Sequence, residues 1–169
     1  MVRYGRVYKS YVAMTRDEVW RFIDEQRTMF VAFETGDGYP HLTPVWFVVA
    51  DEKLYFRTSA GKAKAALAEA GRVCCSVADG ERFTELRGVM VRGRTRLVSE
   101  ADLLEQYRRL KAVKYAGLTS ADLDVPDEWS RSRDADGPTI VEITPERISS
   151  WDNSKLASWS EPVHIGVSE

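Results

Sequence analysis

The sequence is poor in cysteine and histidine, with two of each among 169 residues. Cys74 and Cys75 are adjacent, so in a strand their side chains point to opposite faces and a disulfide between them would be strained. The two histidines, His41 and His164, stand far apart in the chain. Because no spacing of these residues matches a zinc site, we expect free thiols, a reducing compartment and no bound metal.

Long apolar runs and an excess of one charge are also missing. No segment approaches the ~20 apolar residues that cross a bilayer, and the N-terminal residues lack the apolar stretch of a signal peptide. The formal net charge is −2, so no overall field attracts nucleic acid or an anionic membrane. We therefore expect a cytoplasmic protein with neither a nucleic-acid nor a membrane partner. Nucleophile-elbow, Walker and GxGxxG motifs are absent as well.

The residues that are present predict one mainly β domain with α+β character. Hydrophobic residues make up 44% of the chain and charged residues 30%, as in an ordinary globular domain. Apolar periodicity predicts helices over 16–27, 63–70 and 100–115. It predicts strands over 29–34, 41–49, 54–58, 72–78, 84–98, 139–144 and 147–151. The order favours a six- to seven-stranded antiparallel barrel with peripheral helices, a core over 15–152, a long loop over 117–137 and an irregular tail over 153–169.

The junction between the strand ending at Thr58 and the following helix is the first candidate site. It carries basic and hydroxyl residues in the segment that includes Arg57, Thr58, Ser59, Lys62 and Lys64. Free amides and the helix dipole favour an anion at such a junction. Lysines in a first helical turn oppose the dipole, and a bound phosphate would remove that conflict. The alternative is that both lysines are solvated and that Thr58 or Ser59 only caps the helix.

The strand over 41–49 is the second candidate, because Pro44 interrupts it. A proline in a strand indicates an edge, a bulge or a backbone that faces something other than a strand. A flat cofactor can lie against such a strand and accept hydrogen bonds from its backbone. The alternative is an ordinary core strand in which Trp46 fills volume.

Two further groups are weaker candidates. Arg92, Arg94 and Arg96 alternate onto one face of their strand and are suited either to an anionic ligand or to a solvated face. Trp151 and Lys155 follow the last strand and suit a ligand edge, a subunit contact or a simple turn.

Taken in order, these segments resemble the pyridoxamine 5′-phosphate oxidase-like, flavin-binding split-barrel family. The resemblance covers most of 15–152 and is carried by HLTPVWFVV, LYFRTSAGKAKAAL, GRVCCSV, GVMVRGRTRLV and SWDNSK. It implies a split β-barrel and a homodimer with cofactors in clefts between the subunits. The implied cofactor is FMN or the deazaflavin coenzyme F-420. The tail over 161–166 lacks the arginine motif with which true pyridoxamine phosphate oxidases grip their substrate, which disfavours vitamin B6 as the substrate.

The resemblance also implies the roles of particular residues. The cofactor phosphate would be held by Arg57, Thr58, Ser59, Lys62 and Lys64. The isoalloxazine ring would be lined by Thr43, Pro44, Val45 and Trp46, with Trp151 and Lys155 completing the cleft from the end of the barrel. The implied function is a flavin-type oxidoreductase that transfers hydride to or from a small organic substrate. A non-catalytic carrier or sensor that binds flavin or haem, and a purely structural module, remain alternatives.

Overall fold

The computed structural model describes residues 3–5, 10–34, 36–58, 71–116 and 139–158. The strands are β1 (Arg3–Gly5), β2 (Thr28–Glu34), β3 (Pro40–Ala50), β4 (Lys53–Thr58), β5 (Val73–Asp79), β6 (Arg87–Val98) and β7 (Thr139–Asp152). The helices are α1 (Arg16–Glu25) and α3 (Ala101–Lys114), with 3-10 turns η1 (Ser10–Val12), η2 (Phe83–Glu85) and η3 (Asn153–Ser158). The helix expected over 63–70 and the loop expected over 117–137 lie outside the described residues.

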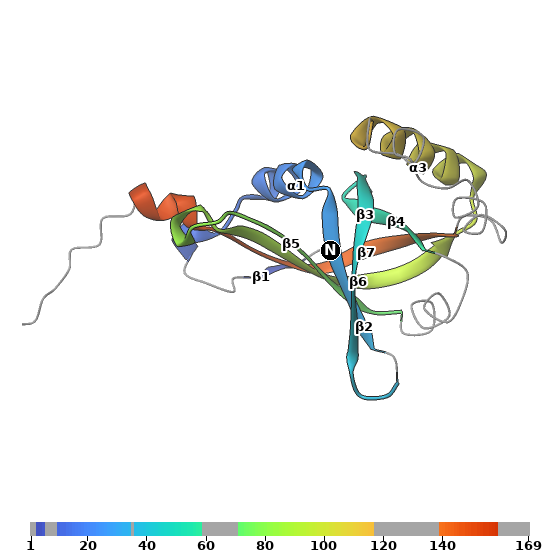
Figure 1. The fold of residues 1–169 in the computed structure, drawn as a ribbon, viewed down its shortest axis with the longest axis horizontal. Coiled ribbons are helices and arrows are strands. Elements are labelled where there is room, and N and C mark those ends of the chain that lie inside the picture. Colours follow the sequence, from blue (N-terminus) through green and yellow to red (C-terminus); the bar gives the residue numbers. More distant parts are fainter. Residues whose placement is uncertain (1–2, 6–9, 35, 59–70, 117–138, 159–169) are drawn as a thin grey trace, which may run out of the picture.

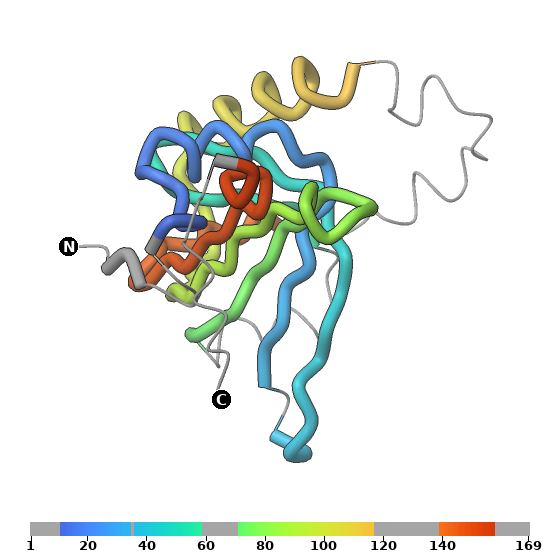
Figure 2. Tube along the Cα trace, turned by 90° about the vertical axis from the view of Figure 1, so that its left-hand side faces the viewer, coloured from blue at the N-terminus to red at the C-terminus, as the bar shows by residue number. Residues whose placement is uncertain are grey.

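Strands β2 to β7 form a closed antiparallel barrel, which confirms the predicted fold (Figure 1). Neighbouring strands follow the order β7-β4-β3-β2-β5-β6, and β6 pairs with β7 to complete the circle. Strand β1, which the sequence did not predict, adds a short parallel pairing to β7. The hairpin of β2 and β3 extends beyond the barrel wall (Figure 2).

Strand β7 corrects the expectation of two strands separated by a turn. It runs without interruption through Pro145, and the pairing with β6 shifts register where Arg92 pairs with Arg147 and Gly93 pairs with Pro145. The extra residue, Glu146, forms a β-bulge, which bends a strand without ending it. Gly93 is required there, because a Cβ atom at this position would lie 2.5 Å from the carbonyl oxygen of Thr144.

The barrel interior is the main hydrophobic core, and α1 closes one end of it. Thr15 and Glu18 form the predicted capping box, in which the Thr15 hydroxyl accepts from the Glu18 amide at 3.3 Å and the Glu18 carboxylate accepts from the Thr15 amide at 2.7 Å. This cap directs the buried face of α1 into the barrel. The interior includes Val19, Phe22, Ile23, Met29, Val31, Phe47, Leu54, Phe56, Cys75, Val89, Val141 and Ile148.

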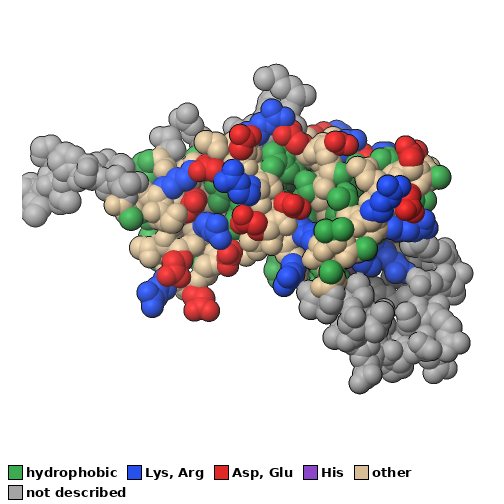
Figure 3. All heavy atoms as spheres, turned by 90° about the horizontal axis from the view of Figure 1, so that it is seen from above, with side chains coloured by type: hydrophobic (Ala, Val, Ile, Leu, Met, Phe, Trp, Pro, Cys, Tyr) green, Lys and Arg blue, Asp and Glu red, His purple; other side chains and the backbone are tan. Residues whose placement is uncertain are grey.

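A second, smaller core lies on the outer face of the wall, under α3. It joins Val48, Tyr55, Val98 and Ile140 of the strands to Tyr107 and Tyr115. The two helices therefore do different things: α1 fills the barrel, whereas α3 covers its outside. Figure 3 views the molecule from the side that carries both helices and shows acidic and basic side chains mixed, without a field of one sign.

Two other expectations need correction. The strand predicted over 84–98 begins only at Arg87, because Phe83–Glu85 forms a 3-10 turn. Within this strand, Gly88 pairs in regular register with Trp151. Its missing side chain leaves room for the Trp151 ring, which would lie 2.1 Å from an added Cβ atom. In the tail, residues 153–158 form η3 rather than irregular chain.

Candidate functional site

The barrel wall opens where β4 leaves β3. The two strands pair only from Phe47–Phe56 to Ala50–Lys53. The last residues of β4, Arg57 and Thr58, continue the pairing with β7 on the other edge of the strand. Within the described strands, residues 40–46 of β3 therefore have no partner on the β4 side. This opening is the split that the family resemblance implied.

The backbone of Pro44 faces this opening. The amide of Phe47 donates to the Tyr115 hydroxyl at 2.8 Å, and that hydroxyl lies 2.8 Å from the Phe47 carbonyl oxygen and 2.7 Å from that of Arg27. The backbone groups of Phe47 thus face the β2 side. Because these groups alternate along a strand, those of Trp46 and Pro44 face the β4 side. A proline, which has no amide to donate, is therefore placed on the unpaired edge.

Trp46 stands beside this edge with one ring face covered. Its side chain is 40% exposed, and its ring stacks on that of Tyr115 at 4.4 Å between centroids with an interplanar angle of 9°. Tyr115 is fully buried, and burial raises the pKa of its phenol to about 12 although a hydrogen bond from the Phe47 backbone opposes the shift. Its hydroxyl therefore stays protonated, and the ring holds the indole in one plane.

The four residues predicted to line a ring do not share one face. Pro44 and Trp46 are exposed on the outer face, whereas Thr43 and Val45 are half-buried. Val45 packs against the interior core. Because side chains alternate along a strand, only Pro44 and Trp46 can present side chains to a ligand on the outer face.

The basic junction adjoins the same opening. Arg57 and Thr58 are half-buried at the end of β4. The backbone of Arg57 forms a hydrogen bond with Tyr107, whose pKa is raised to about 12, chiefly by burial. Tyr107 and Tyr115 of the α3 region thus hold the backbone on both sides of the split. Ser59, Lys62 and Lys64 lie outside the described residues.

Trp151 and Lys155 lie at the other end of the barrel. Arg57 pairs with Ile140 and Trp151 pairs with Gly88 at the far end of β7. About 11 residues of strand, or roughly 35 Å, separate Ile140 from Trp151. One subunit therefore does not bring Trp151 and Lys155 together with the split.

Lys155 has partners of its own in this chain. Its ammonium lies 2.7 Å from the Glu18 carboxylate and 3.1 Å from the carbonyl oxygen of Ala13. The hydrogen bond from Lys155, together with the Thr15 amide, lowers the pKa of Glu18. This contact ties η3 to the start of α1.

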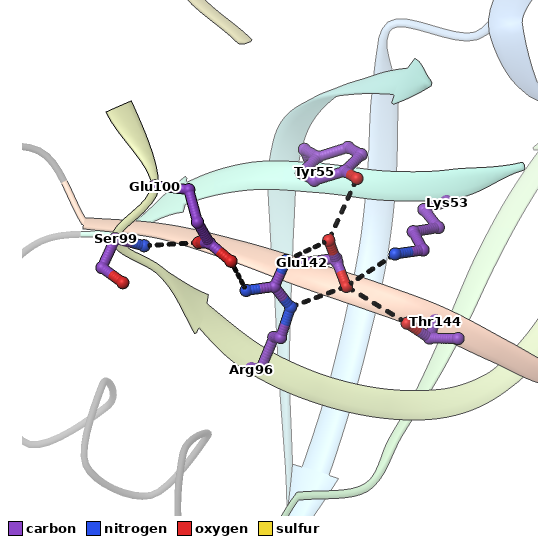
Figure 4. Close-up of polar contacts among 7 residues, drawn as sticks. All are labelled: Lys53, Tyr55, Arg96, Ser99, Glu100, Glu142 and Thr144. Atoms are coloured by element: carbon purple, nitrogen blue, oxygen red, sulfur yellow. Dashed lines mark hydrogen bonds and ion pairs between the residues drawn. The ribbon is translucent and has the colours of Figure 1, made fainter. Parts of the chain in front are cut away.

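Beneath the start of α3, a buried carboxylate gathers several donors (Figure 4). Glu142 is 2% exposed and accepts from Arg96 at 2.8 and 2.9 Å, from Lys53 at 3.1 Å and from Tyr55 at 3.1 Å. Burial alone would raise the pKa of Glu142, but the bonds from Arg96, Lys53 and Tyr55 outweigh it and lower the pKa to about 2. Arg96 also binds Glu100, the residue before α3, at 2.6 Å. The network therefore fixes that helix on the wall.

The arginines of β6 differ in their surroundings. Arg96 belongs to the Glu142 network, and Arg94 binds Glu146 at 2.6 Å. Arg92 is exposed, and it has no ion pair in the described part of the chain. Of the other sequence candidates, His41 is exposed with its ring 4.9 Å from that of Phe33.

The two cysteines are free, as the sequence predicts. Cys74 and Cys75 are unbonded, and burial raises the pKa of the Cys75 thiol. None of the described helices is long and apolar enough to span a bilayer. The described residues also contain no group of three potential metal ligands.

Sequence reasoning missed Tyr115 and Glu142. Nothing near Tyr115 in the sequence marks its role, because its partners lie 68 and 88 residues away. Glu142 did leave a signal: a lone carboxylate inside the apolar run Ile140-Val141-Glu142-Ile143. A buried charge requires partners, so this position predicts an ion-pair network.

Comparisons with known proteins agree with this geometry. The family model described as pyridoxamine 5′-phosphate oxidase matches residues 15–150. The chain therefore belongs to the pyridoxamine 5′-phosphate oxidase family. No curated protein matches significantly.

Several solved structures share the fold. A conserved hypothetical protein of Mycobacterium tuberculosis is 26% identical, with a TM-score of 0.74 over 95% of this chain and 98% of that one. An FAD binding protein of Mycobacterium smegmatis is 19% identical, with a TM-score of 0.59 over 82% and 98%. A flavocytochrome of Azotobacter vinelandii is 21% identical, with a TM-score of 0.62 over 91% and 79%. These neighbours include flavin-binding proteins, and the chain shares their barrel.

Proposed function

We propose that this chain is a flavin-type oxidoreductase that transfers hydride to or from a small organic substrate. The cofactor is FMN or the deazaflavin coenzyme F-420, bound beside the unpaired edge of β3. The proposal rests on one observation: the edge of β3 at Pro44 and the basic end of β4 at Arg57 lie at the same opening in the barrel wall. Membership of the family and flavin-binding neighbours support the same cofactor class.

The residues at the split fit such a cofactor. Unpaired backbone groups of β3 match the donors and acceptors on the rim of a flavin ring, and Trp46 offers a flat apolar surface beside them. Arg57, with Thr58, Ser59, Lys62 and Lys64, supplies the cations and hydroxyls that a phosphate needs.

The chain's own contribution is binding and electrostatics. A bound flavin supplies the hydride chemistry. The basic junction anchors the phosphate, and the rigid wall orients the ring. Backbone amides on the open edge of β3, such as that of Trp46, are donors suited to stabilising negative charge on a reduced ring. No dedicated acid–base residue is needed, since water supplies and accepts protons.

We further propose that the working unit is a homodimer. The outer face of β2 and β3 exposes Phe30 (48%), Leu42 (61%) and Trp46 (40%). Phe30 pairs with Pro44, so these side chains form one apolar patch. Because one subunit keeps Trp151 and Lys155 away from the split, the cleft implied by the family resemblance requires these two residues to come from the second copy.

The assembly is tested by sedimentation equilibrium. Replacing Leu42 with aspartate places a charge in the patch and should convert a dimer into a monomer, while Val113→Asp, at a still more exposed apolar position on α3, should leave the dimer intact. A wild-type protein that is monomeric at all concentrations contradicts this part of the proposal.

Cofactor binding is tested by titrating the purified protein with FMN, FAD and F-420 in parallel, following cofactor fluorescence. Lys62→Ala should weaken the tightest binder by about 1–3 kcal/mol, the value of one charge-assisted contact. Arg82→Ala is the matched control, because it removes the same charge from an exposed site at η2. Failure of all three compounds to bind, or equal affinity in Lys62→Ala, contradicts the proposal. Binding without turnover by any electron donor would instead indicate a carrier or sensor.

A further inference from the structure

Two arginines stand directly opposite each other in the barrel wall. Arg92 of β6 pairs in register with Arg147 of β7, and both side chains are exposed. The two positions form one row of cations across the sheet. Like charges at directly opposed positions destabilise a sheet. The repulsion between Arg92 and Arg147 therefore lowers the stability of the fold unless another group neutralises the two charges.

Nearby carboxylates do not neutralise this row. Glu146, next to Arg147, forms an ion pair with Arg94 at 2.6 Å. Glu142 forms an ion pair with Arg96 in the network under α3. Among the described residues, neither Arg92 nor Arg147 forms an ion pair or a side-chain hydrogen bond. Arg72, just before β5, is exposed and equally without such a partner in the described part of the chain.

The β-bulge places Arg147 in this row. Because Glu146 is the extra residue, both Glu146 and Arg147 are exposed, whereas Pro145 and Ile148 on either side are buried. Without the bulge, strict alternation would turn one of the two exposed residues into the barrel. The bulge thus places the Glu146 carboxylate beside Arg94 and places Arg147 opposite Arg92.

The row borders a cleft in the same wall. The cleft has a volume of about 470 Å³ and lies between the ends of β2 and β3 on one side and β5 and β6 on the other. Arg72, Arg92 and Arg94 line it, together with Glu146 and, from β2, Glu34. Since Glu146 is neutralised by Arg94, the charges without an ion pair among the described lining residues are two arginines and one carboxylate. A cleft of this size accommodates a small molecule.

We propose that Arg72, Arg92 and Arg147 form a binding site for a small ligand that carries two oxyanion groups, either phosphate or carboxylate. The guanidinium fork binds both groups in a bidentate manner. The ligand removes the repulsion between Arg92 and Arg147 and partly fills the cleft. The site shares no residue with the proposed flavin site and does not depend on it.

The experiment measures thermal unfolding of the apo protein with inorganic pyrophosphate, citrate or sodium chloride at matched ionic strength. Pyrophosphate or citrate should raise the midpoint above the sodium chloride value, and the better of the two identifies the oxyanion class. Arg92→Gln should raise the midpoint without anion, because it removes the repulsion, and should weaken anion binding at least about tenfold. Arg147→Gln should do the same.

Two controls separate this site from others. Arg109→Gln removes a charge of α3 that is already paired with Glu105 and does not line the cleft, so it should leave anion binding nearly unchanged. Lys62→Ala, at the proposed phosphate site of the cofactor, should retain the full response. A response that is lost in Lys62→Ala but kept in Arg92→Gln would overturn the proposal. So would equal effects of all three salts on the wild-type protein.

A second readout locates the bound anion. Cys74 pairs in register with Arg92 and lines the cleft, whereas Cys75 is buried. Alkylation of Cys74 by iodoacetamide, a neutral reagent, should slow in the presence of the stabilising anion, and this protection should disappear in Arg92→Gln. Unchanged alkylation in the presence of a saturating, stabilising anion would overturn the assignment to this cleft.

Discussion

A tryptophan lies near each end of β7, but the two tryptophans have different surroundings. At the end near Trp151, the aromatic ring lies over Gly88, and the lysine of η3 is bound to Glu18 at the start of α1. At the end near Thr139, β4 and β3 separate, so Trp46 keeps one ring face open beside an unpaired backbone edge. At the closed end the ring and the cation both contact the chain itself, whereas at the split end the Trp46 side chain remains 40% exposed.

The largest expected effect comes from Glu142, which supports α3 at the split end. Its folded pKa of about 2 lies below the ordinary value of 4.5, so its contribution is present above pH 4.5 and is lost as the pH falls toward 2. This corresponds to about 3 kcal/mol of unfolding free energy. Urea unfolding of wild type and Glu142→Gln at pH 7 and at acid pH should show the difference shrinking as the pH falls. A difference that is constant with pH would contradict the network's role.

At the closed end, Gly88→Ala tests whether Trp151 is a structural residue. The added Cβ would overlap the indole, and overpacking of this kind costs about 2 kcal/mol. Cofactor affinity per folded subunit should fall as well, because the proposed dimer places the partner's Trp151 at the split. Guanidinium unfolding and cofactor titration of the same variant separate the two roles. Gly88→Ala combined with Trp151→Ala, which removes the clash, should recover part of the lost stability.

Tyr115→Phe tests the hydroxyl that bridges β2 and β3 while keeping the ring under Trp46. Loss of the acceptor leaves the buried Phe47 amide without its partner, which costs about 1–2 kcal/mol. If the hydroxyl also orients Trp46, the near-ultraviolet circular dichroism of the variant should change, and Trp46→Phe should remove that change. An unchanged spectrum would show that stacking alone holds the indole.

The smallest effect is expected for Lys155→Ala. The lost contact to Glu18 is partly exposed, so it should cost about 1 kcal/mol or less. Chemical unfolding measures that loss, and Arg109→Ala, which removes an exposed i,i+4 pair on α3, is the control. A drop in cofactor affinity in Lys155→Ala would show that this lysine also serves the neighbouring subunit's site, and would blur the distinction between the two ends.

How far the sequence predicts this molecule depends on how local each signal is. The capping box at Thr15, the strand over 41–49 and the proline within it are local patterns, and each is found as expected. By contrast, the sequence predicts two strands, 139–144 and 147–151, and only the pairing with β6 across the bulge shows that one strand continues through Pro145.

In the candidate site, too, only the features that depend on neighbouring residues can be predicted from the sequence. Strand alternation could have predicted that Pro44 and Trp46 face one way while Thr43 and Val45 face the other. No local pattern predicts that Lys155 meets Glu18, because 137 residues separate them. The same holds for the Tyr115 hydroxyl, whose role appears only when the ends of two strands and a helix meet.

Pro44 has one more consequence, for solubility. The free stretch of β3 would otherwise be a template on which a strand from another molecule adds, the first step of ordered aggregation. Because Pro44 has no amide to donate, an incoming strand could not form a continuous row of hydrogen bonds with this stretch. Pro44, which lies on the open edge of the wall, therefore helps to prevent strands of other chains from adding there.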